Sequence, residues 1–209
     1  MPADKRQLRA SLRAARSALV DRVGADGAAA ESALFLKAAV ASGLLSPDGR
    51  PGEIGPVTVT AYIASPGEPD PSNIRAAVVA AGGQVLLPIP RAGRIMDWAL
   101  DDGGYAWSGP LPIQVPTGEV LGSGAACLLE QGVDLVLAPA LAVDRSGSRL
   151  GQGGGFYDRL LGELANSGAR VRVLAMVRSS EVLPAGEVPR ETHDVRVPGV
   201  LTPEGVVQF

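Results

Sequence analysis

The run Asp134–Ala138 (DLVLA) constrains the fold more than any other feature, because nearly all of its side chains are apolar. A strand of this kind is typical of the centre of a parallel sheet that is covered on both faces by helices. A second run, Val171–Val177 (VRVLAMV), has the same character. Between them, Phe156–Asn166 carries apolar side chains at helical spacing. The three segments predict a strand, a helix and a further central strand.

A similar unit of strand, helix and strand precedes these three segments in the chain. Val57–Ile63 (VTVTAYI) is rich in β-branched residues and predicts a strand. A helix is expected from Ser72 or Asn73 to Ala81, and Gln84–Ile89 predicts the next strand. A crossover of this length implies that the two strands are parallel.

The remaining segments complete the expected architecture. Apolar spacing predicts two helices at the N-terminus, about Lys5–Val20 and Ala28–Ser42, with Gly43 as a stop. Residues 91–124 are rich in Gly, Pro and Asp and are expected to form an irregular excursion, and the tail is expected to be extended with a short strand near Val200. The fold class is therefore α/β: an open three-layer α/β/α sandwich with a mostly parallel central sheet, Rossmann-like topology and a single domain over residues 1–209.

Composition excludes several functional classes. The formal charge is −3 and the pI is near 5.2, whereas a nucleic-acid-binding domain is normally basic. Cys127 is the single cysteine, so neither an intrachain disulfide nor a Cys-based zinc site is possible. No stretch approaches the roughly 20 apolar residues that span a bilayer. We expect a soluble, cytoplasmic protein without nucleic-acid or membrane partners.

The segment Arg149–Asp158 (RLGQGGGFYD) follows a predicted strand and opens a predicted helix. In open α/β sheets, ligands bind beside the carboxyl ends of strands. Its glycines allow backbone amides to approach an anion, and the helix N-terminus and Arg149 add positive charge. The loop lacks the Gly-Lys-Ser/Thr of a Walker A motif, and Phe156 stands where a dinucleotide fingerprint requires Gly or Ala. A polyphosphate site and a turn without function both remain open.

Other candidate residues carry weaker signals. Asp158, in the first helical turn, could bind Mg²⁺ beside a phosphate or could simply complement the helix dipole. Glu68 lies on the ligand side of the sheet, although a loop glutamate is usually solvated. The single histidine, His193, and Cys127 are more typical of structural roles. The arginine stripe of the first helix (Arg6, Arg9, Arg13, Arg16) is typical of a solvated face, although Lys5 and Arg9 could equally be directed at phosphates. Trp98, Tyr105 and Trp107 could stack on a planar ligand or pack in a core.

Together these segments resemble the 5-formyltetrahydrofolate cyclo-ligase family. Residues 134–161 are similar to the family pattern of an apolar strand, Pro, Asp-x-x-Gly-x-Arg-Leu-Gly, a three-glycine turn and Tyr-Asp. Matching segments flank it in the expected order: Lys5-Arg6-Gln7-Leu8-Arg9, Glu68, and Pro189-x-Glu191-x-His193-Asp194. The resemblance spans almost the whole chain.

The resemblance implies that 5-formyltetrahydrofolate and ATP are converted into 5,10-methenyltetrahydrofolate, ADP and phosphate, with Mg²⁺ as cofactor. Separately, we expect a monomer, although the sequence does not reveal the oligomeric state. Arg149 and Asp158 would be catalytic, and Asp158 and Asp194 would bind the metal. ATP would contact Lys5, Arg6, Gln7, Leu8, Arg9, Arg149, Leu150, Gly151, Gln152, Gly153, Gly154, Gly155, Phe156 and Tyr157. Folate would contact Arg9, Ile63, Glu68, Gln152, Gly153, Gly154, Gly155 and Phe156.

Three positions depart from the family pattern. Gln152 stands where an aromatic or basic residue is common, Val115 stands where an acidic residue is common, and Phe156 replaces a usual Tyr. Two alternatives therefore stay open beside the ligase: a non-catalytic folate- or nucleotide-binding relative, and an ATP-dependent enzyme that acts on another N-formyl or carboxamide substrate.

Overall fold

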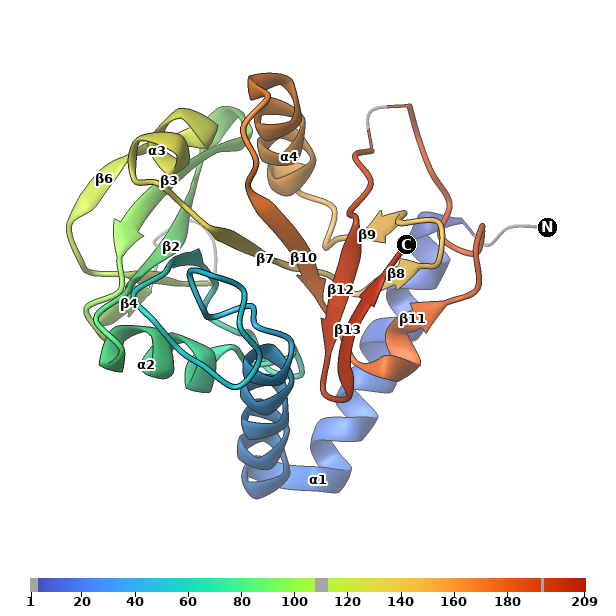
Figure 1. Ribbon diagram of the computed structural model, residues 1–209. Helices are drawn as coiled ribbons and strands as arrows, with labels where there is room; N and C mark the ends of the chain where they lie inside the picture. Colours follow the sequence, from blue (N-terminus) through green and yellow to red (C-terminus); the bar gives the residue numbers. More distant parts are fainter. Residues whose placement is uncertain (1–3, 108–112, 193) are drawn as a thin grey trace.

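The computed structural model describes residues 4–107, 113–192 and 194–209, and its centre is an eight-stranded sheet (Figure 1). The strand order is β13 (Gly205–Gln208), β12 (Gly199–Thr202), β10 (Arg172–Met176), β7 (Leu135–Pro139), β1 (Thr58–Thr60), β2 (Gln84–Arg91), β3 (Ile95–Leu100) and β6 (Val120–Ser123). The five inner strands from β12 to β2 are parallel, and antiparallel strands extend both edges. The prediction of a mostly parallel α/β sheet is confirmed.

Helices cover both faces of this sheet, which confirms the three layers. One face packs against the second half of α1 (Lys5–Ala41) and against α2 (Ser72–Ala80), through residues such as Phe35 and Val78. The other face packs against α3 (Gly124–Glu130) and α4 (Phe156–Ser167), through Leu128 and Leu161. Figure 1 shows α2 and α3–α4 on opposite sides of the strands.

The strand order identifies the place where a ligand can enter. The parallel strands run β2-β1-β7-β10-β12, which is the 2-1-3-4-5 order of a doubly wound sheet. The helix that follows β1 lies on one face, and the helix that follows β7 lies on the other. The loops after β1 and β7 therefore diverge and leave a crevice at their carboxyl ends, as expected at a topological switch point.

The two predicted N-terminal helices are continuous across a bend. The backbone of Gly24 has φ +62°, a left-handed conformation that glycine adopts at low cost, and α1 turns there. The second segment packs on α2 and the sheet, whereas the first runs back along the molecule to the carboxyl ends of the strands (Figure 1). This bend is what brings the N-terminal residues to the switch point.

The prediction of an irregular excursion over residues 91–124 was wrong for much of its length. It contains the turn η1 (Ala92–Arg94), β3, β6 and a hairpin of β4 (Tyr105–Trp107) and β5 (Gln114–Pro116). β3 was missed because its pattern of buried residues does not alternate regularly. The tail, predicted to hold one short strand, forms the β12–β13 hairpin. A separate small sheet consists of β11 (Val182–Leu183), β8 (Ala142–Asp144) and β9 (Arg149–Leu150), and β11 directly follows the 3₁₀ turn η2 (Ser179–Glu181).

Within the described residues, no helix is both long and apolar enough to cross a membrane.

Candidate active site

A cavity of about 650 Å³ lies at the switch point between β1 and β7. It is bounded by the loops that follow these strands, the start of α1, the β2–β3 hairpin and part of the C-terminal tail. The predicted site residues that line it are Lys5, Arg6, Arg9, Ile63, Glu68, Arg149, Leu150, Gly151, Gln152, Gly153, Gly154, Gly155, Phe156, Tyr157, Asp158 and Asp194. Segments far apart in the sequence therefore meet in one hollow.

Two predicted residues, Gln7 and Leu8, are not among those that line the cavity. Gln7 is exposed, and Leu8 packs against the apolar cluster of Leu141, Leu150 and Val188. These contacts follow from helical geometry, because successive residues of a helix point in different directions. Leu8 instead holds the start of α1 against the strand that leads into the glycine loop.

The glycine loop has a backbone that only glycine adopts readily. Gly153 has φ +109° and Gly155, the N-cap of α4, has φ +71°. The free N–H groups of the first turn of α4 follow directly, and such groups together with the helix dipole favour an anion. A Cβ atom at Gly151 would lie 2.7 Å from Nη1 of Arg149. A side chain at Gly151 would therefore have to displace the Arg149 guanidinium.

Arg149 lies beneath this loop and is only partly satisfied. Its Nη2 donates to Oδ1 of Asp158 at 3.0 Å, its Nη1 donates to the carbonyl oxygen of Pro139 at 3.3 Å, and its guanidinium lies 5.7 Å from the Tyr157 ring centre. Three buried side-chain polar atoms in the described residues have no hydrogen-bond partner, and two of them are Nε of Arg149 and the hydroxyl of Tyr157. Buried polar groups are normally paired, so two such atoms beside one cavity indicate a ligand.

The Tyr157 hydroxyl remains protonated. Burial raises the pKa of Tyr157 well above its ordinary value, and the neighbouring Arg149 opposes this shift only in part. The hydroxyl is therefore a hydrogen-bond donor at neutral pH, like the guanidinium beside it. Both unpaired groups suit an anionic oxygen.

The start of α1 covers the cavity and is fixed by ion pairs to the tail. Nζ of Lys5 lies 2.5 Å from Oδ2 of Asp194 and 3.0 Å from Oε1 of Glu191. Burial lowers the pKa of Lys5, but its hydrogen bonds to Asp194 and Glu191 outweigh burial and leave the pKa above its ordinary value. One turn later, Nε of Arg9 donates to the carbonyl oxygen of Gly151 at 2.9 Å. A charged lysine and an arginine are thus held at the mouth of the cavity.

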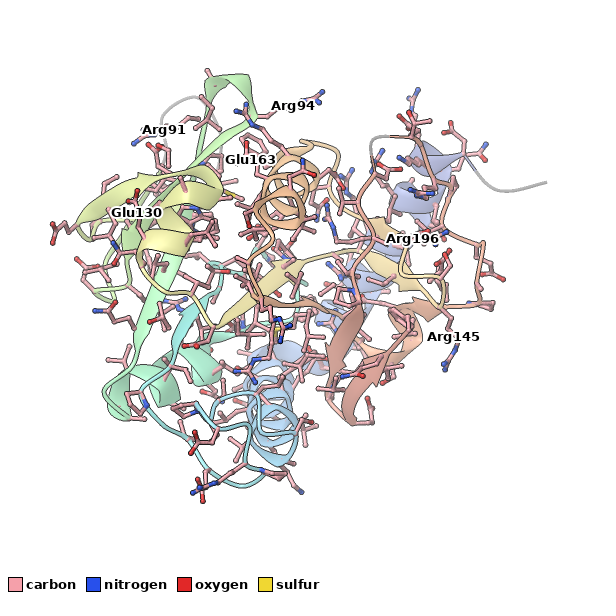
Figure 2. The ribbon with its side chains drawn as sticks, turned by 45° about the horizontal axis from the view of Figure 1, so that its top comes forward. Arg91, Arg94, Glu130, Arg145, Glu163 and Arg196 are labelled. Atoms are coloured by element: carbon pink, nitrogen blue, oxygen red, sulfur yellow. The ribbon has the colours of Figure 1, made fainter. Side chains whose placement is uncertain are left out.

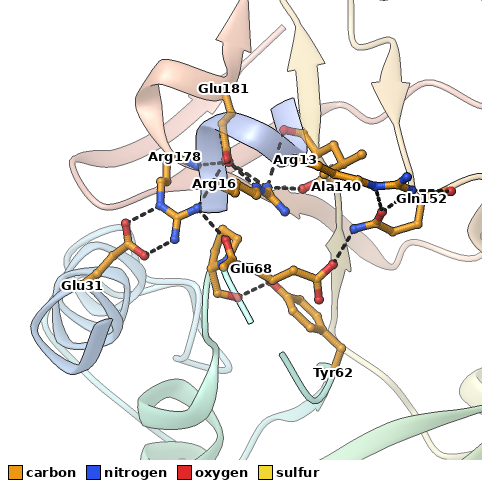
Figure 3. Close-up of polar contacts among 12 residues, drawn as sticks. Arg13, Arg16, Glu31, Tyr62, Glu68, Ala140, Gln152, Arg178 and Glu181 are labelled. Atoms are coloured by element: carbon orange, nitrogen blue, oxygen red, sulfur yellow. Dashed lines mark hydrogen bonds and ion pairs between the residues drawn. The ribbon is translucent and has the colours of Figure 1, made fainter. Parts of the chain in front are cut away.

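Glu68, in the loop after β1, is connected to the glycine loop (Figure 3). Its Oε2 accepts from the N–H of Ser65 at 3.0 Å, and its Oε1 accepts from Nε2 of Gln152 at 3.0 Å. The side-chain oxygen of Gln152 accepts two hydrogen bonds from Arg13, at 2.8 and 3.0 Å. One chain of contacts therefore joins the loops after β1 and β7 with α1.

An ion-pair network, buried at Arg16 and Glu181 and half-buried at Arg178 and Glu31, lies behind Glu68 (Figure 3). Arg16 binds both carboxylate oxygens of Glu181, at 2.7 and 2.9 Å, and Arg178 binds both oxygens of Glu31 at 2.6 Å. Arg178 also donates to the carbonyl oxygen of Gly67, next to Glu68, at 2.9 Å. The interpretation of the arginine stripe as a solvated face is wrong for Arg16, because its neighbours come from distant loops that helical periodicity does not show.

The carboxylates of this region differ in their surroundings. Asp144 is fully buried and accepts hydrogen bonds from Ser146 and Ser148 on Oδ1 and from the N–H groups of Gly186 and Val188 on Oδ2. Burial alone would raise the pKa of Asp144, but these bonds outweigh it and leave the pKa below its ordinary value. Asp144 therefore ties two loops together.

Asp158 and Asp194, predicted to bind a metal, both line the cavity. Asp158 pairs with Arg149, and Asp194 pairs with Lys5. The described residues contain no group of three or more His, Cys, Asp or Glu side chains arranged to hold a metal. The carboxylates available at the cavity fit a hard cation that takes one or two protein ligands and completes its coordination with phosphate oxygens and water.

Several residues of the cavity were not predicted. Pro88, Pro90, Met96 and Arg94, from the β2–β3 hairpin, and Ile113 line it as well. The sequence gives no signal for them, since the approach of the first four depends on the antiparallel turn after β2 and that of Ile113 on the packing of β5 against β2.

The remaining candidates divide between core and surface. Trp98 is fully buried, which agrees with the alternative that it packs in a core. Cys127 is also a buried core residue, as expected for a structural role. Trp107 is 70% exposed. His193 lies outside the described residues.

Comparisons with known proteins agree with the resemblance found in the sequence. A family model described as "5-formyltetrahydrofolate cyclo-ligase family" matches residues 1–203. The chain is 37% identical over 162 residues to the 5-formyltetrahydrofolate cyclo-ligase of Mycolicibacterium smegmatis, which covers 72% of this chain and 76% of the relative. It is 27% identical over 155 residues to the enzyme of the same name from Escherichia coli K12, which covers 73% and 81%.

Solved structures share the fold. The 5,10-methenyltetrahydrofolate synthetase of Aquifex aeolicus is similar with a TM-score of 0.66 and 23% identity, over 98% of this chain and 92% of that one. The synthetase of Mycoplasma pneumoniae is similar with a TM-score of 0.68 and 15% identity, over 95% and 98%.

Proposed function

This chain belongs to the 5-formyltetrahydrofolate cyclo-ligase family and is an enzyme of that type, and we propose that its reaction takes place in the cavity between β1 and β7. The family uses ATP. The observation that carries the proposal is the pair of unpaired buried donors, Nε of Arg149 and the hydroxyl of Tyr157, beside a glycine loop that opens a helix. These groups would donate to the triphosphate of ATP.

The rest of the nucleotide site would come from both sides of the loop. Lys5, Arg6 and Arg9 would close over the nucleotide from α1, while the amides of the Gly151–Gly155 segment would contact its phosphates. Asp158 would do two things: it already orients Arg149, and with Asp194 it would hold Mg²⁺. When bound, Mg²⁺ would offset negative charge on the triphosphate during transfer.

Glu68 would bind the pterin ring of the folate. Its two carboxylate oxygens accept hydrogen bonds from the N–H of Ser65 and from the amide of Gln152. The carboxylate is therefore held in one orientation, in which it can also accept hydrogen bonds from a flat, donor-rich ring. Ile63 would supply an apolar wall, together with Phe156. Folate would have to displace the Gln152 amide from Glu68 or bind beside it.

The chemistry needs positioning more than a protein nucleophile. The formyl oxygen of the substrate attacks the γ-phosphorus, the bond to ADP breaks, and the formyl carbon is left carrying a phosphate ester in place of a poor leaving group. The neighbouring amine nitrogen then attacks this carbon, loses its proton, and phosphate departs with the former formyl oxygen. Arg149, Tyr157 and the loop amides would hold the charged oxygens throughout, and the cavity would keep the two substrates in contact. We further propose that one domain over residues 1–209 carries out this reaction as a monomer.

The test is to mix the purified chain with 5-formyltetrahydrofolate and MgATP and nothing else. We expect the methenyl-folate absorbance to grow with release of one ADP and one phosphate per turnover, and EDTA to stop it. ATP binding without any absorbance change, across preparations shown to be folded, would contradict the proposal and favour a non-catalytic relative or another N-formyl substrate.

A further inference from the structure

Arg94 lies at the tip of the β2–β3 hairpin in a backbone conformation that non-glycine residues rarely adopt. Its φ is +60°, and in the described residues it is the one non-glycine position with a positive φ. A left-handed backbone at an arginine is unfavourable because the Cβ atom approaches the following carbonyl oxygen, and glycine or asparagine would fit better. Strain of this kind tends to be kept where it serves a function.

The position of the hairpin tip is fixed from α4. Nη1 of Arg159 donates to the carbonyl oxygen of Gly93 at 3.0 Å, and Nε of Arg159 is held by Glu163 at 2.8 Å. Glu163 in turn accepts from the N–H of Ala125, at the start of α3. The tip therefore keeps a defined place beside α4, although its side chains are exposed.

The guanidinium of Arg94 lies against the end of the glycine loop. A Cβ atom built at Gly155 would be 3.3 Å from Cζ, Nε and Nη1 of Arg94. Arg9 approaches Gly153 in the same way, with Cζ at 3.6 Å from such an atom, and Nη1 of Arg149 approaches Gly151. Three guanidinium groups from three different elements thus lie against three glycines of one loop.

Arg94 differs from its neighbour Arg91 in its contacts. Arg91 is exposed and pairs with Asp97, whose Oδ2 lies 2.7 Å from its Nε. Arg94 lines the cavity, and its side chain has no hydrogen bond or ion pair with any residue that the structure describes. In Figure 2 the two side chains leave the hairpin in different directions, with Arg94 on the side of α4.

We propose that Arg94 is a phosphate-binding residue of the nucleotide site, which contacts ATP from the β2–β3 hairpin across the N-terminus of α4. This inference rests on the proposed function, because it takes the glycine loop as the place of the triphosphate. An anion held by the free N–H groups at the start of α4 lies within reach of Arg94, and a guanidinium can donate to two phosphate oxygens at once. The strained backbone is the cost of directing that group into the cavity.

The experiment compares Arg94→Gly, Arg94→Lys and the control Arg91→Ala in the full-length chain. Calorimetric titration would measure the binding of ATP and of tripolyphosphate, which has no nucleoside, and steady-state kinetics would measure KM for ATP and for 5-formyltetrahydrofolate. For Arg94→Gly we expect affinity for both phosphate probes to fall roughly 10- to 100-fold, as for lost hydrogen bonds to a charged group. KM for folate should stay near that of the wild type, Arg94→Lys should lose less, and Arg91→Ala should match the wild type.

Thermal unfolding separates this role from a structural one. Glycine relieves the left-handed strain, so Arg94→Gly should unfold at the wild-type temperature or above it. A lower unfolding temperature with unchanged phosphate binding would overturn the proposal. So would a rise confined to the KM for folate, which would assign Arg94 to the carboxylates of the substrate's glutamate tail. If the wild-type chain itself bound neither probe, the proposed function would fail before the question of Arg94 arose.

Discussion

Two groups of charged residues lie on either side of Glu68, and they are paired in different ways. In the ion-pair network of Arg16, Glu181, Arg178 and Glu31, each guanidinium meets a carboxylate through two hydrogen bonds. Around the glycine loop, Arg149 makes one hydrogen bond to Asp158 and one to the carbonyl oxygen of Pro139, and its Nε has no partner among the described residues. Arginine and carboxylate side chains are therefore fully paired with each other in one region, and leave hydrogen-bond donors available in the other.

The difference follows from what each region must do. A buried pair that loses one partner leaves an uncompensated charge, so a network that only supports the fold is stable when it is complete. A site that receives a triphosphate needs donors that water or a ligand can satisfy, and its own carboxylates must not saturate them. The completeness of pairing, more than the number of charges, distinguishes scaffold from site here.

Removing one carboxylate from the ion-pair network should have the largest effect on stability. Glu181→Gln leaves Arg16 and Arg178 with one neutralising carboxylate between them, that of Glu31. We expect a loss of about 3–5 kcal/mol in the free energy of unfolding, with little change in the rate per folded molecule. Urea unfolding measures the change in free energy, and steady-state rates divided by the folded fraction measure the rate per folded molecule. The matched control is Glu53→Gln, since Glu53 is exposed and 3.9 Å from Arg50.

At the cavity, removing a carboxylate should affect turnover more than stability. Asp158→Asn keeps an oxygen that can accept from Arg149 but removes the charge proposed for Mg²⁺. Turnover at limiting Mg²⁺ should fall on the order of 10- to 100-fold, while stability changes by about 1 kcal/mol or less, as for a charge at a helix N-terminus. Mg²⁺ titrations of the rate, alongside thermal unfolding, check both. An unfolded variant with a normal rate per folded molecule would favour the dipole role alone.

Asp144 is a carboxylate whose two oxygens both accept hydrogen bonds, and its contribution to stability should depend on pH. Its pKa in the folded protein lies below the ordinary value. The carboxylate therefore stabilises the fold above about pH 4, and this contribution is lost as the pH falls through the folded-state pKa. Asp144→Asn should cost about 2 kcal/mol at pH 7, and the gap to the wild type should shrink in acid. Unfolding curves at pH 7, 4 and 3 test this; a gap independent of pH would contradict it.

Glu68 lies between the two regions, and its replacement should have a smaller effect. Glu68→Ala removes the carboxylate proposed for the pterin, and KM for 5-formyltetrahydrofolate should rise about 10-fold while ATP affinity stays nearly intact. Initial-rate measurements that vary each substrate in turn separate the two. An equal loss of ATP affinity would show that Glu68 acts through the Gln152 contact on the glycine loop.

Local patterns were sufficient to predict most of the sheet. The apolar strands β7 and β10 and the helix α4 between them follow from side chains that pack within one element and its immediate neighbours. The strand β3 was missed, because its register comes from pairing with β2 and not from its own alternation. α2 ends within one residue of its predicted end, before Gly82, whereas β1 ends at Thr60, three residues before the predicted end at Ile63.

The residues of the site could be predicted where a local pattern or a motif marks them, as for the sheet. The glycine loop carries its own signal, and Lys5–Arg9, Glu68 and Asp194 came from the resemblance. Arg94 and Glu181 did not, because an arginine in a turn and a glutamate in a short 3₁₀ segment acquire their roles only from the chain that folds against them. Contacts between distant segments leave no periodic trace in the sequence.

The measurement that tests the account most directly is Tyr157→Phe, which removes one buried, unpaired hydroxyl and little else. Since this group has no hydrogen-bond partner among the residues that the structure describes, its loss should leave the unfolding temperature unchanged or raise it. kcat/KM for ATP should fall about 10-fold, the loss expected for one hydrogen bond to a charged ligand. A lower unfolding temperature with unchanged kcat/KM would mean that the hydroxyl serves the fold, and the donors around the glycine loop would then not be kept for a triphosphate.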